Sequence, residues 1–277
     1  PVENDELIFE EKDETFTCGI DIASDEKFFV ISTSDHITTE NHFFSVNEKK
    51  IKPRLFLSRE KNVRYSIDSW KDYFYLHSNK DARDYKILRC KKDNINEFEE
   101  YIPAKKGIII GGFDFLDDYI IRGESSDAIP KLFIRDLRTN KEEEIKISNE
   151  QIGSPGASLM QRDTNTTKIR VSWESMITQG KIYEYDIRTK EKKLVKEVEI
   201  PSGHDPDKYV VERLRAKSHD GRMIPITLIR RKDIMLDSKS KMVLYAYGAY
   251  KHSVGVSFNS SRFCLVDRGI IFAIAHV

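Results

Sequence analysis

The sequence of 277 residues lacks several features that point to particular classes of protein. It has no excess charge, because 46 Lys and Arg residues balance 46 Asp and Glu residues. This balance gives no electrostatic reason to expect a nucleic acid or an anionic membrane as a partner. It has only three cysteines, Cys18, Cys90 and Cys264, which are too few and too widely spaced for a disulfide framework or a zinc site. We therefore expect free thiols, a cytoplasmic location, no metal and no other cofactor.

Long apolar runs are also missing. The longest covers residues 270–275, whereas a bilayer span needs roughly 20 apolar residues. Residues 1–11 are acidic and lack the basic and apolar segments of a signal peptide, so we expect none in the sequence as given. The chain is nevertheless 39% apolar and 10% aromatic at zero net charge, which is the composition of a folded protein with a hydrophobic core.

Short β-branched and aromatic runs of strand length recur along the first two thirds of the chain, and no helical period appears near them. Each run follows a similar anchor: Gly19-Ile-Asp21, Ser66-Ile-Asp68, Gly112-Phe-Asp114 and Leu159-Met-Gln161, with last residues 47, 46 and 47 apart. A second strand-like run follows in each unit. Short strands repeating at this period predict the blades of a β-propeller. The alternative is an all-β domain with coincidental spacing, and the Asp anchors are expected to cap turns rather than bind metal.

The pattern changes at the turn-rich segment Pro201–Asp207. Beyond it, two strand-like runs flank an Asp-Gly turn at residues 219–221, which predicts a hairpin. Residues 241–246 and 269–275 read as buried strands, the second covered on both faces as in an α/β sheet, with a short crossover helix within 257–267. We therefore expect a mainly β protein: a propeller segment of about four blades over residues 1–207, and the start of an α/β domain over residues 208–277.

The second domain resembles the beginning of the hydrolase domain in the prolyl oligopeptidase family of serine peptidases. Three stretches carry the resemblance, in the same order as in the family: residues 213–229, 244–250 and 261–277. Residues 9–16 and 73–79 resemble the oligopeptidase B (protease II) branch of that family. The resemblance implies that the chain is an internal or truncated segment of a protein with a seven-bladed propeller and an α/β-hydrolase (peptidase S9) domain. It also implies an enzyme that hydrolyses short peptides, after Lys or Arg in this branch.

Acyl transfer on this fold needs a Ser on a Gly-x-Ser-x-Gly elbow, followed by an Asp and a His. The sequence has no such elbow, and the resemblance puts all three triad residues after Val277, so we expect this chain alone to be inactive. By the resemblance, Tyr247 matches the family tyrosine whose hydroxyl stabilises the oxyanion, a role that rests on a fixed donor near the developing charge. We expect His276 to be structural.

The resemblance assigns no substrate-binding residue. The oligopeptidase B branch has two carboxylates that attract basic side chains, and the matching positions here are Gly255 and Ser257. A buried basic side chain is poorly bound without a carboxylate partner.

Three hypotheses remain open from the sequence. The first is a segment of a serine oligopeptidase that acts on short peptides. The second is a non-catalytic, propeller-like binding or scaffold module. The third is one subunit of a split peptidase, in which a second chain carries the triad and docks near Val277.

Overall fold

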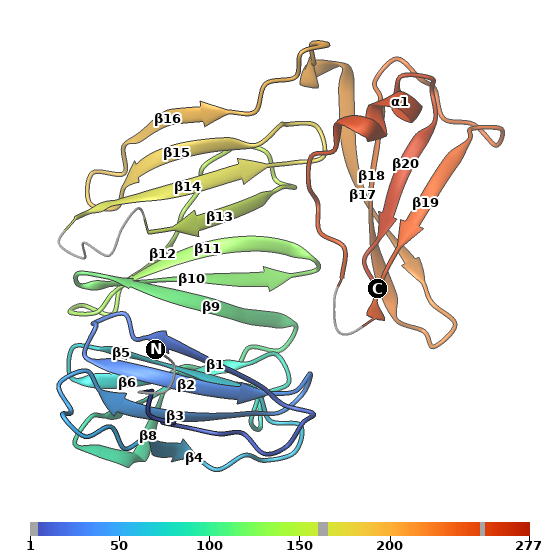
Figure 1. Cartoon of the computed structure of the whole chain (residues 1–277). Coiled ribbons are helices and arrows are strands. Elements are labelled where there is room, and N and C mark those ends of the chain that lie inside the picture. The colour runs from blue at the N-terminus through green and yellow to red at the C-terminus, as the bar shows by residue number, and fades with distance from the viewer. Residues whose placement is uncertain (1–4, 160–165, 250–252) are drawn as a thin grey trace. The chain divides into compact units, whose positions relative to one another are not determined.

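The computed structural model describes residues 5–159, 166–249 and 253–277. The chain divides into two compact units, Pro1–Phe115 and Leu116–Val277, and each is described by itself. Strands dominate both units (Figure 1). The runs predicted from the sequence are strands in the structure. Of the fourth anchor, Met160 and Gln161 lie outside the described residues.

The first unit holds two four-stranded antiparallel sheets, each with its strands in sequence order (Figure 1). The first sheet contains β1 (Thr17–Ile22), β2 (Phe28–Ser34), β3 (Thr39–Ser45) and β4 (Arg54–Leu57). The second contains β5 (Tyr65–Trp70), β6 (Tyr73–Ser78), β7 (Lys86–Lys91) and β8 (Asn94–Ile102). Strand β9 (Ile108–Leu116) lies at the boundary of the units. Adjacent antiparallel strands joined by short turns are the pattern predicted for propeller blades.

Aromatic side chains fill the space between these two sheets. Phe43, Phe56 and Phe74 pack edge to face with ring centroids 5.1–5.7 Å apart, and Phe74 is almost completely buried. The anchor Asp68 ties the sheets together, because its carboxylate accepts hydrogen bonds from the backbone N and the hydroxyl of Ser24 in the β1–β2 turn, at 2.8 and 2.5 Å. Asp68 therefore caps a turn of the neighbouring sheet, as the sequence predicts.

The second unit contains two further antiparallel arrangements and a mixed sheet. Strands β10 (Tyr119–Ser126), β11 (Ile129–Asp136) and β12 (Glu142–Glu144) pair in that order. So do β13 (Ser154–Ser158), β14 (Lys168–Glu174), β15 (Lys181–Asp186) and β16 (Lys192–Glu197). The mixed sheet contains β17 (Tyr209–Lys217), β18 (Met223–Arg231), β19 (Met242–Ala246) and β20 (Ile271–Ala275). Its order is β17-β18-β20-β19, in which β19 and β20 are parallel.

The mixed sheet confirms most of the local predictions for residues 208–277. Strands β17 and β18 form the predicted hairpin, with Gly221 at the turn in the left-handed region at φ +85°. A 3-10 helix, Pro206–Lys208, directly precedes β17, and a second one, Ser260–Arg262, directly precedes the short helix α1 (Phe263–Val266). Helix α1 lies within the predicted crossover. Strand β20 is largely buried and shares a core with Met176, Tyr209 and Phe263.

The prediction that residues 241–246 form a buried strand is wrong. Every residue of β19 is exposed, and Leu244 retains 54% of its accessible surface. The exposure follows from the place of β19 at the edge of the mixed sheet, where β20 is its one partner among the described residues. Its apolar side chains therefore face solvent on both sides of the sheet.

The predicted domain boundary between residues 207 and 208 stays a prediction. Met176 precedes that boundary and Tyr209 follows it, yet both belong to one buried cluster. The boundary between the two compact units lies elsewhere, after Phe115.

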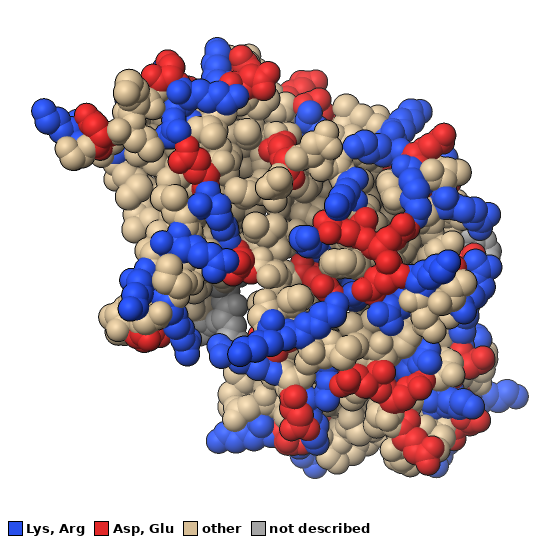
Figure 2. Space-filling view, turned by 180° about the vertical axis from the view of Figure 1, so that it is seen from behind, with Lys and Arg blue, Asp and Glu red and all other residues tan. Residues whose placement is uncertain are grey.

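Charged side chains of both signs are interspersed over the face shown in Figure 2, in keeping with the net charge of zero. Among the described residues, no group of three or more His, Cys, Asp or Glu side chains is placed to hold a metal ion. No helix in the described part of the chain is long and apolar enough to cross a membrane.

Candidate functional site

The candidate site lies at the carboxyl ends of the parallel strands β19 and β20. Ala246 pairs with Ala275, so the residues that follow, Tyr247 and His276, emerge at the same edge of the sheet. This is the edge at which open α/β sheets bind ligands. Tyr247 is 42% exposed there, so it is accessible to a ligand at that edge.

Gly248 brings the segment after β19 against the end of β20. A Cβ atom at this position would lie 2.8 Å from Cγ2 of Val277 and 3.2 Å from its carbonyl oxygen. A Cβ atom here would displace the Val277 methyl group and press on the Val277 carbonyl, so glycine is the residue that fits without rearrangement. The close approach fixes where the chain goes directly after Tyr247.

His276 is buried, with 6% of its surface exposed, and both ring nitrogens have partners. Nε2 lies 2.8 Å from the hydroxyl of Thr227, and Nδ1 lies 2.6 Å from the carbonyl oxygen of Val254. Burial lowers the pKa of His276, the positive charge of Arg213 lowers it further, and the bond to Val254 opposes the decrease. A buried, neutral and doubly bonded imidazole agrees with the structural role expected for this residue.

Residues 254–258 contain the two positions where the resemblance places carboxylates. Val256 is completely buried, whereas the space around Gly255 is open. The carbonyl oxygen of Ser257 accepts a hydrogen bond of 3.0 Å from the guanidinium of Arg262. The backbone N of Phe258 donates to the carboxylate of Glu174, at 3.3 Å. Two side chains therefore hold this stretch: Arg262, from the 3-10 helix before α1, and Glu174, from β14.

Arg262 is a buried cation that the sequence did not single out. It is 8% exposed and its guanidinium lies 4.7 Å from the ring centroid of Phe272. Burial lowers the pKa of Arg262, and the carboxylate of Glu174 opposes that decrease. Arg262 and Glu174 are 88 residues apart in the sequence, so no spacing in the sequence could indicate this charge interaction.

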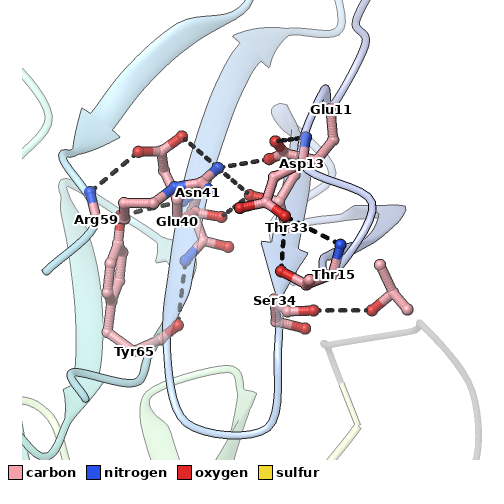
Figure 3. Close-up of polar contacts among 10 residues, drawn as sticks. Glu11, Asp13, Thr15, Thr33, Ser34, Glu40, Asn41, Arg59 and Tyr65 are labelled. Carbon is pink, nitrogen blue, oxygen red and sulfur yellow. Dashed lines mark hydrogen bonds and ion pairs between the residues drawn. The ribbon is translucent and has the colours of Figure 1, made fainter. Parts of the chain in front are cut away.

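A second polar cluster lies in the first unit and has a structural explanation. Figure 3 shows the guanidinium of Arg59 directed at the carboxylates of Glu11 and Glu40, and Glu40 also accepts a 3.0 Å bond from the backbone N of Arg59. The ring of Phe16 lies 4.1 Å from the same guanidinium. The pKa of Glu11 is lowered by the backbone bond from Asp13 and then by Arg59. The cluster thus attaches the N-terminal segment to the first sheet.

The structure brings Tyr247, Gly248 and His276 to one sheet edge, and His276 contacts the residue before Gly255. Positions 255 and 257 are glycine and serine, so neither supplies a carboxylate. Lys and Arg side chains of a substrate would therefore find no partner from these two residues. The predicted roles of Tyr247, Gly255 and Ser257 stay predictions.

Comparisons with known proteins give one consistent result. A family model described as the prolyl oligopeptidase N-terminal β-propeller domain matches residues 1–198. Dipeptidyl aminopeptidase BI of Pseudoxanthomonas mexicana is 31% identical over the whole chain, which covers 38% of that protein. Protease 2 of Moraxella lacunata is 26% identical over the whole chain, which covers 39% of it.

Solved structures agree with these relatives. Oligopeptidase B from Trypanosoma brucei with covalently bound antipain matches the whole chain with a TM-score of 0.91 and 25% identity, and the match covers 41% of that structure. Oligopeptidase B from Leishmania major matches 99% of the chain with a TM-score of 0.89 at 20% identity, which shows the fold, and 40% of that structure is covered. The chain thus spans about two fifths of the length of the proteins it matches.

Proposed function

The chain belongs to the prolyl oligopeptidase family, and on this premise we propose that it is a segment of a serine oligopeptidase that hydrolyses short peptides in the cytoplasm. The observation that carries the proposal is the match to oligopeptidase B over the whole chain, from the propeller sheets through β20. Residues 1–207 would supply the propeller, and the mixed sheet of residues 208–277 would begin the α/β-hydrolase domain. Three free thiols suit a reducing compartment.

The chain by itself is proposed to be inactive, because its sequence has no nucleophile elbow. A serine-directed phosphonate probe should therefore not label it. Protease 2 of Moraxella lacunata, treated in parallel, is the positive control. Stoichiometric labelling of the isolated chain would refute this part of the proposal.

Tyr247 is proposed to donate a hydrogen bond to the oxyanion of the tetrahedral intermediate. Its place at the carboxyl edge of β19 supports the role, because ligands bind at that edge. In the full-length peptidase that includes this chain, Tyr247→Phe should lower kcat by roughly 10²–10³-fold with a small effect on KM. The matched control is Tyr245→Phe, on a tyrosine two residues earlier that is 49% exposed, against 42% for Tyr247. An equal loss in both variants would contradict the assignment.

Cleavage after Lys or Arg is proposed from the resemblance to oligopeptidase B, although Gly255 and Ser257 supply no carboxylate. Restoring acidity with Gly255→Asp or Ser257→Asp should raise kcat/KM for a peptide with Lys at the cleavage site by about 10–100-fold, because a hydrogen bond to a charged group contributes about 1.5–3 kcal/mol. A matched peptide with norleucine in place of Lys is the control. A similar gain for both peptides would exclude charge recognition at these positions.

One observation favours a second candidate, in which this chain is one subunit of a split peptidase. Within the part of the chain that the structure describes, the outer side of β19 has no paired strand, and β19 exposes Met242, Val243 and Leu244. Such edges can pair with strands of other chains. A polypeptide carrying the triad would continue the sheet there. Sedimentation velocity of the chain with and without Val243→Lys distinguishes the candidates. A monodisperse monomer in both cases favours a free-standing binding or scaffold module. Association abolished by the lysine would show that the outer side of β19 recruits a strand, as the split enzyme requires.

A further inference from the structure

His276 connects three segments that are far apart in the sequence. It follows β20, Thr227 lies in β18, and Val254 lies in the segment that leads to the helix α1. The ring nitrogens contact Thr227 Oγ1 at 2.8 Å and Val254 O at 2.6 Å. Since the side chain is only 6% exposed, water does not compete strongly for either contact.

The partners determine which ring nitrogen carries the proton. A backbone carbonyl only accepts, so Nδ1 of His276 must donate to Val254. In the neutral ring Nε2 is then an acceptor, so the hydroxyl of Thr227 donates to it. That hydroxyl oxygen also accepts a hydrogen bond from Nη1 of Arg213. A continuous series of hydrogen bonds therefore runs from Arg213 through Thr227 and His276 to Val254.

This series fixes one end of the stretch in which the resemblance places the substrate-binding residues. Val254 directly precedes Gly255, and a Cβ atom at Gly255 would lie more than 4 Å from every described residue other than its two neighbours in the chain. The other end is held by the bonds from Arg262 to Ser257 and from Phe258 to Glu174. The position of Gly255 therefore depends on the bond between His276 and Val254.

We infer that His276 is a positioning residue that holds residues 254–257 at the carboxyl edge of β20. The same end of β20 receives Gly248, which follows Tyr247, through the close approach of Gly248 to Val277. One sheet edge thus orients both the proposed oxyanion donor and the proposed wall of the peptide site. The link to peptide binding rests on the proposed function, whereas the positioning is a property of this chain alone.

The first test uses this chain without any substitution. Nitrogen-15 NMR of the histidine side chains distinguishes a proton on Nδ1 from one on Nε2. We expect His276 to carry it on Nδ1 near neutral pH, the opposite of the tautomer that free histidine favours. A ring with its proton on Nε2, or an averaged signal, would overturn the inference.

The second test compares two substitutions that each keep half of the contacts. The amide of His276→Asn can take the place of Nδ1 and donate to Val254, whereas the amide of His276→Gln reaches the place of Nε2 and Thr227. Hydrogen exchange of residues 253–258 should stay close to wild type in the asparagine variant. It should quicken by about 2–10-fold in the glutamine variant, the effect of one hydrogen bond. Equal protection in the two variants would overturn the inference.

The third test is made in the full-length peptidase. His276→Gln should raise KM for a short peptide more than it lowers kcat, and His276→Asn should raise KM less. Unchanged KM in the glutamine variant, with its exchange result as expected, would overturn the link to peptide binding and leave the positioning established. Absence of peptidase activity in the wild-type full-length protein would instead refute the proposed function, and the two tests on this chain would still decide the positioning.

Discussion

Replacement of Arg122 by methionine should severely destabilise the second unit. The Arg122 side chain, on β10, has no exposed surface, and its guanidinium bonds the carboxylate of Glu124 at 2.6 Å and that of Glu142 at 2.5 Å. Glu124 is 5% exposed as well, and Glu142 also accepts a 2.9 Å bond from Arg135. The group spans β10, β11 and β12, so it connects all three strands.

The magnitude follows from what the substitution leaves behind. Arg122→Met removes the guanidinium that faces two carboxylates, and loss of one partner of a buried ion pair costs about 3–5 kcal/mol. At about 2–4 °C per kcal/mol for a unit of this size, the melting temperature should fall by about 6–20 °C. Replacing Arg122 together with its two carboxylate partners should recover much of the loss, because a buried ion pair can be exchanged for neutral groups at little net cost. The triple variant Arg122→Met, Glu124→Gln, Glu142→Gln tests this.

The assay is urea or thermal unfolding followed by circular dichroism, with a control in the same sheet. Glu144 on β12 pairs with Lys131 at 3.1 Å, but the two side chains are 28% and 47% exposed. Glu144→Gln should therefore change the free energy of unfolding by less than about 1 kcal/mol. If Arg122→Met cost no more than Glu144→Gln, the argument from burial would be refuted.

The pH dependence supplies an independent check on the same group. Burial would raise the pKa of Glu142, but the bonds and charges of Arg122 and Arg135 outweigh it and hold the pKa below its usual value of 4.5. A carboxyl with a lowered pKa stabilises the folded state above its unfolded pKa and loses that contribution as the pH falls. The difference in stability between wild type and Glu142→Gln should therefore shrink below about pH 4.5.

Three further predictions follow from single contacts. Gly248→Ala should cost about 1–3 kcal/mol of stability, because its Cβ would clash with the end of β20, whereas Gly255→Ala, with open space around it, should cost little; equal effects in thermal melts would contradict this. Burial lowers the pKa of His77, so the folded state favours the neutral ring, and the stability that it contributes should be lost as the pH falls below about 6.5; His77→Gln should flatten this part of the pH profile. Burial raises the pKa of the Cys90 thiol to about 11, so a disulfide reagent should modify the two exposed cysteines of the native chain quickly and Cys90 only on unfolding; three fast thiols would disprove the burial.

The sequence predicts strands and turns well where local chemistry decides them. The hairpin of β17 and β18 follows from alternating apolar residues around an Asp-Gly turn, and the structure places Gly221 in the left-handed conformation that such turns need. The regular anchors likewise lie in β1, β5 and β9, each of which is an edge strand of its own sheet. In these cases the local sequence is enough to predict the backbone conformation.

Equal spacing does not predict equal environment. Asp21 in β1 and Asp68 in β5 are equivalent anchors of the repeat, but Asp21 is exposed, whereas Asp68 is bonded to Ser24 and burial raises its pKa. The difference arises from the neighbouring sheet, which β5 has on that side. A repeat in the sequence therefore predicts where a residue stands in a strand, and the adjacent sheet determines its chemistry.

The candidate site divides in the same way. Tyr247 could be chosen from the sequence because a family motif surrounds it, and its place at a sheet edge follows from the strand before it. The series from Arg213 to Val254 could not be chosen, because Thr227 and His276 are 49 residues apart and meet only when β18 and β20 pair. Polar contacts across a sheet have no period in the sequence.

Strands β19 and β20 show why composition alone predicts burial correctly for one strand and wrongly for the other. Both are apolar and both read as buried, but β20 pairs on both edges, whereas β19 pairs on one and exposes all five residues. An apolar strand is suited to burial, and exposed apolar edges are a liability that folded proteins usually cover. The wrong prediction therefore concerns the burial of β19 and not the strand itself, because β20 is its one partner among the described residues. We expect such an edge to associate with a strand of another chain, and sedimentation of the Val243→Lys variant tests this, since a lysine on the edge should prevent association and leave the mixed sheet intact.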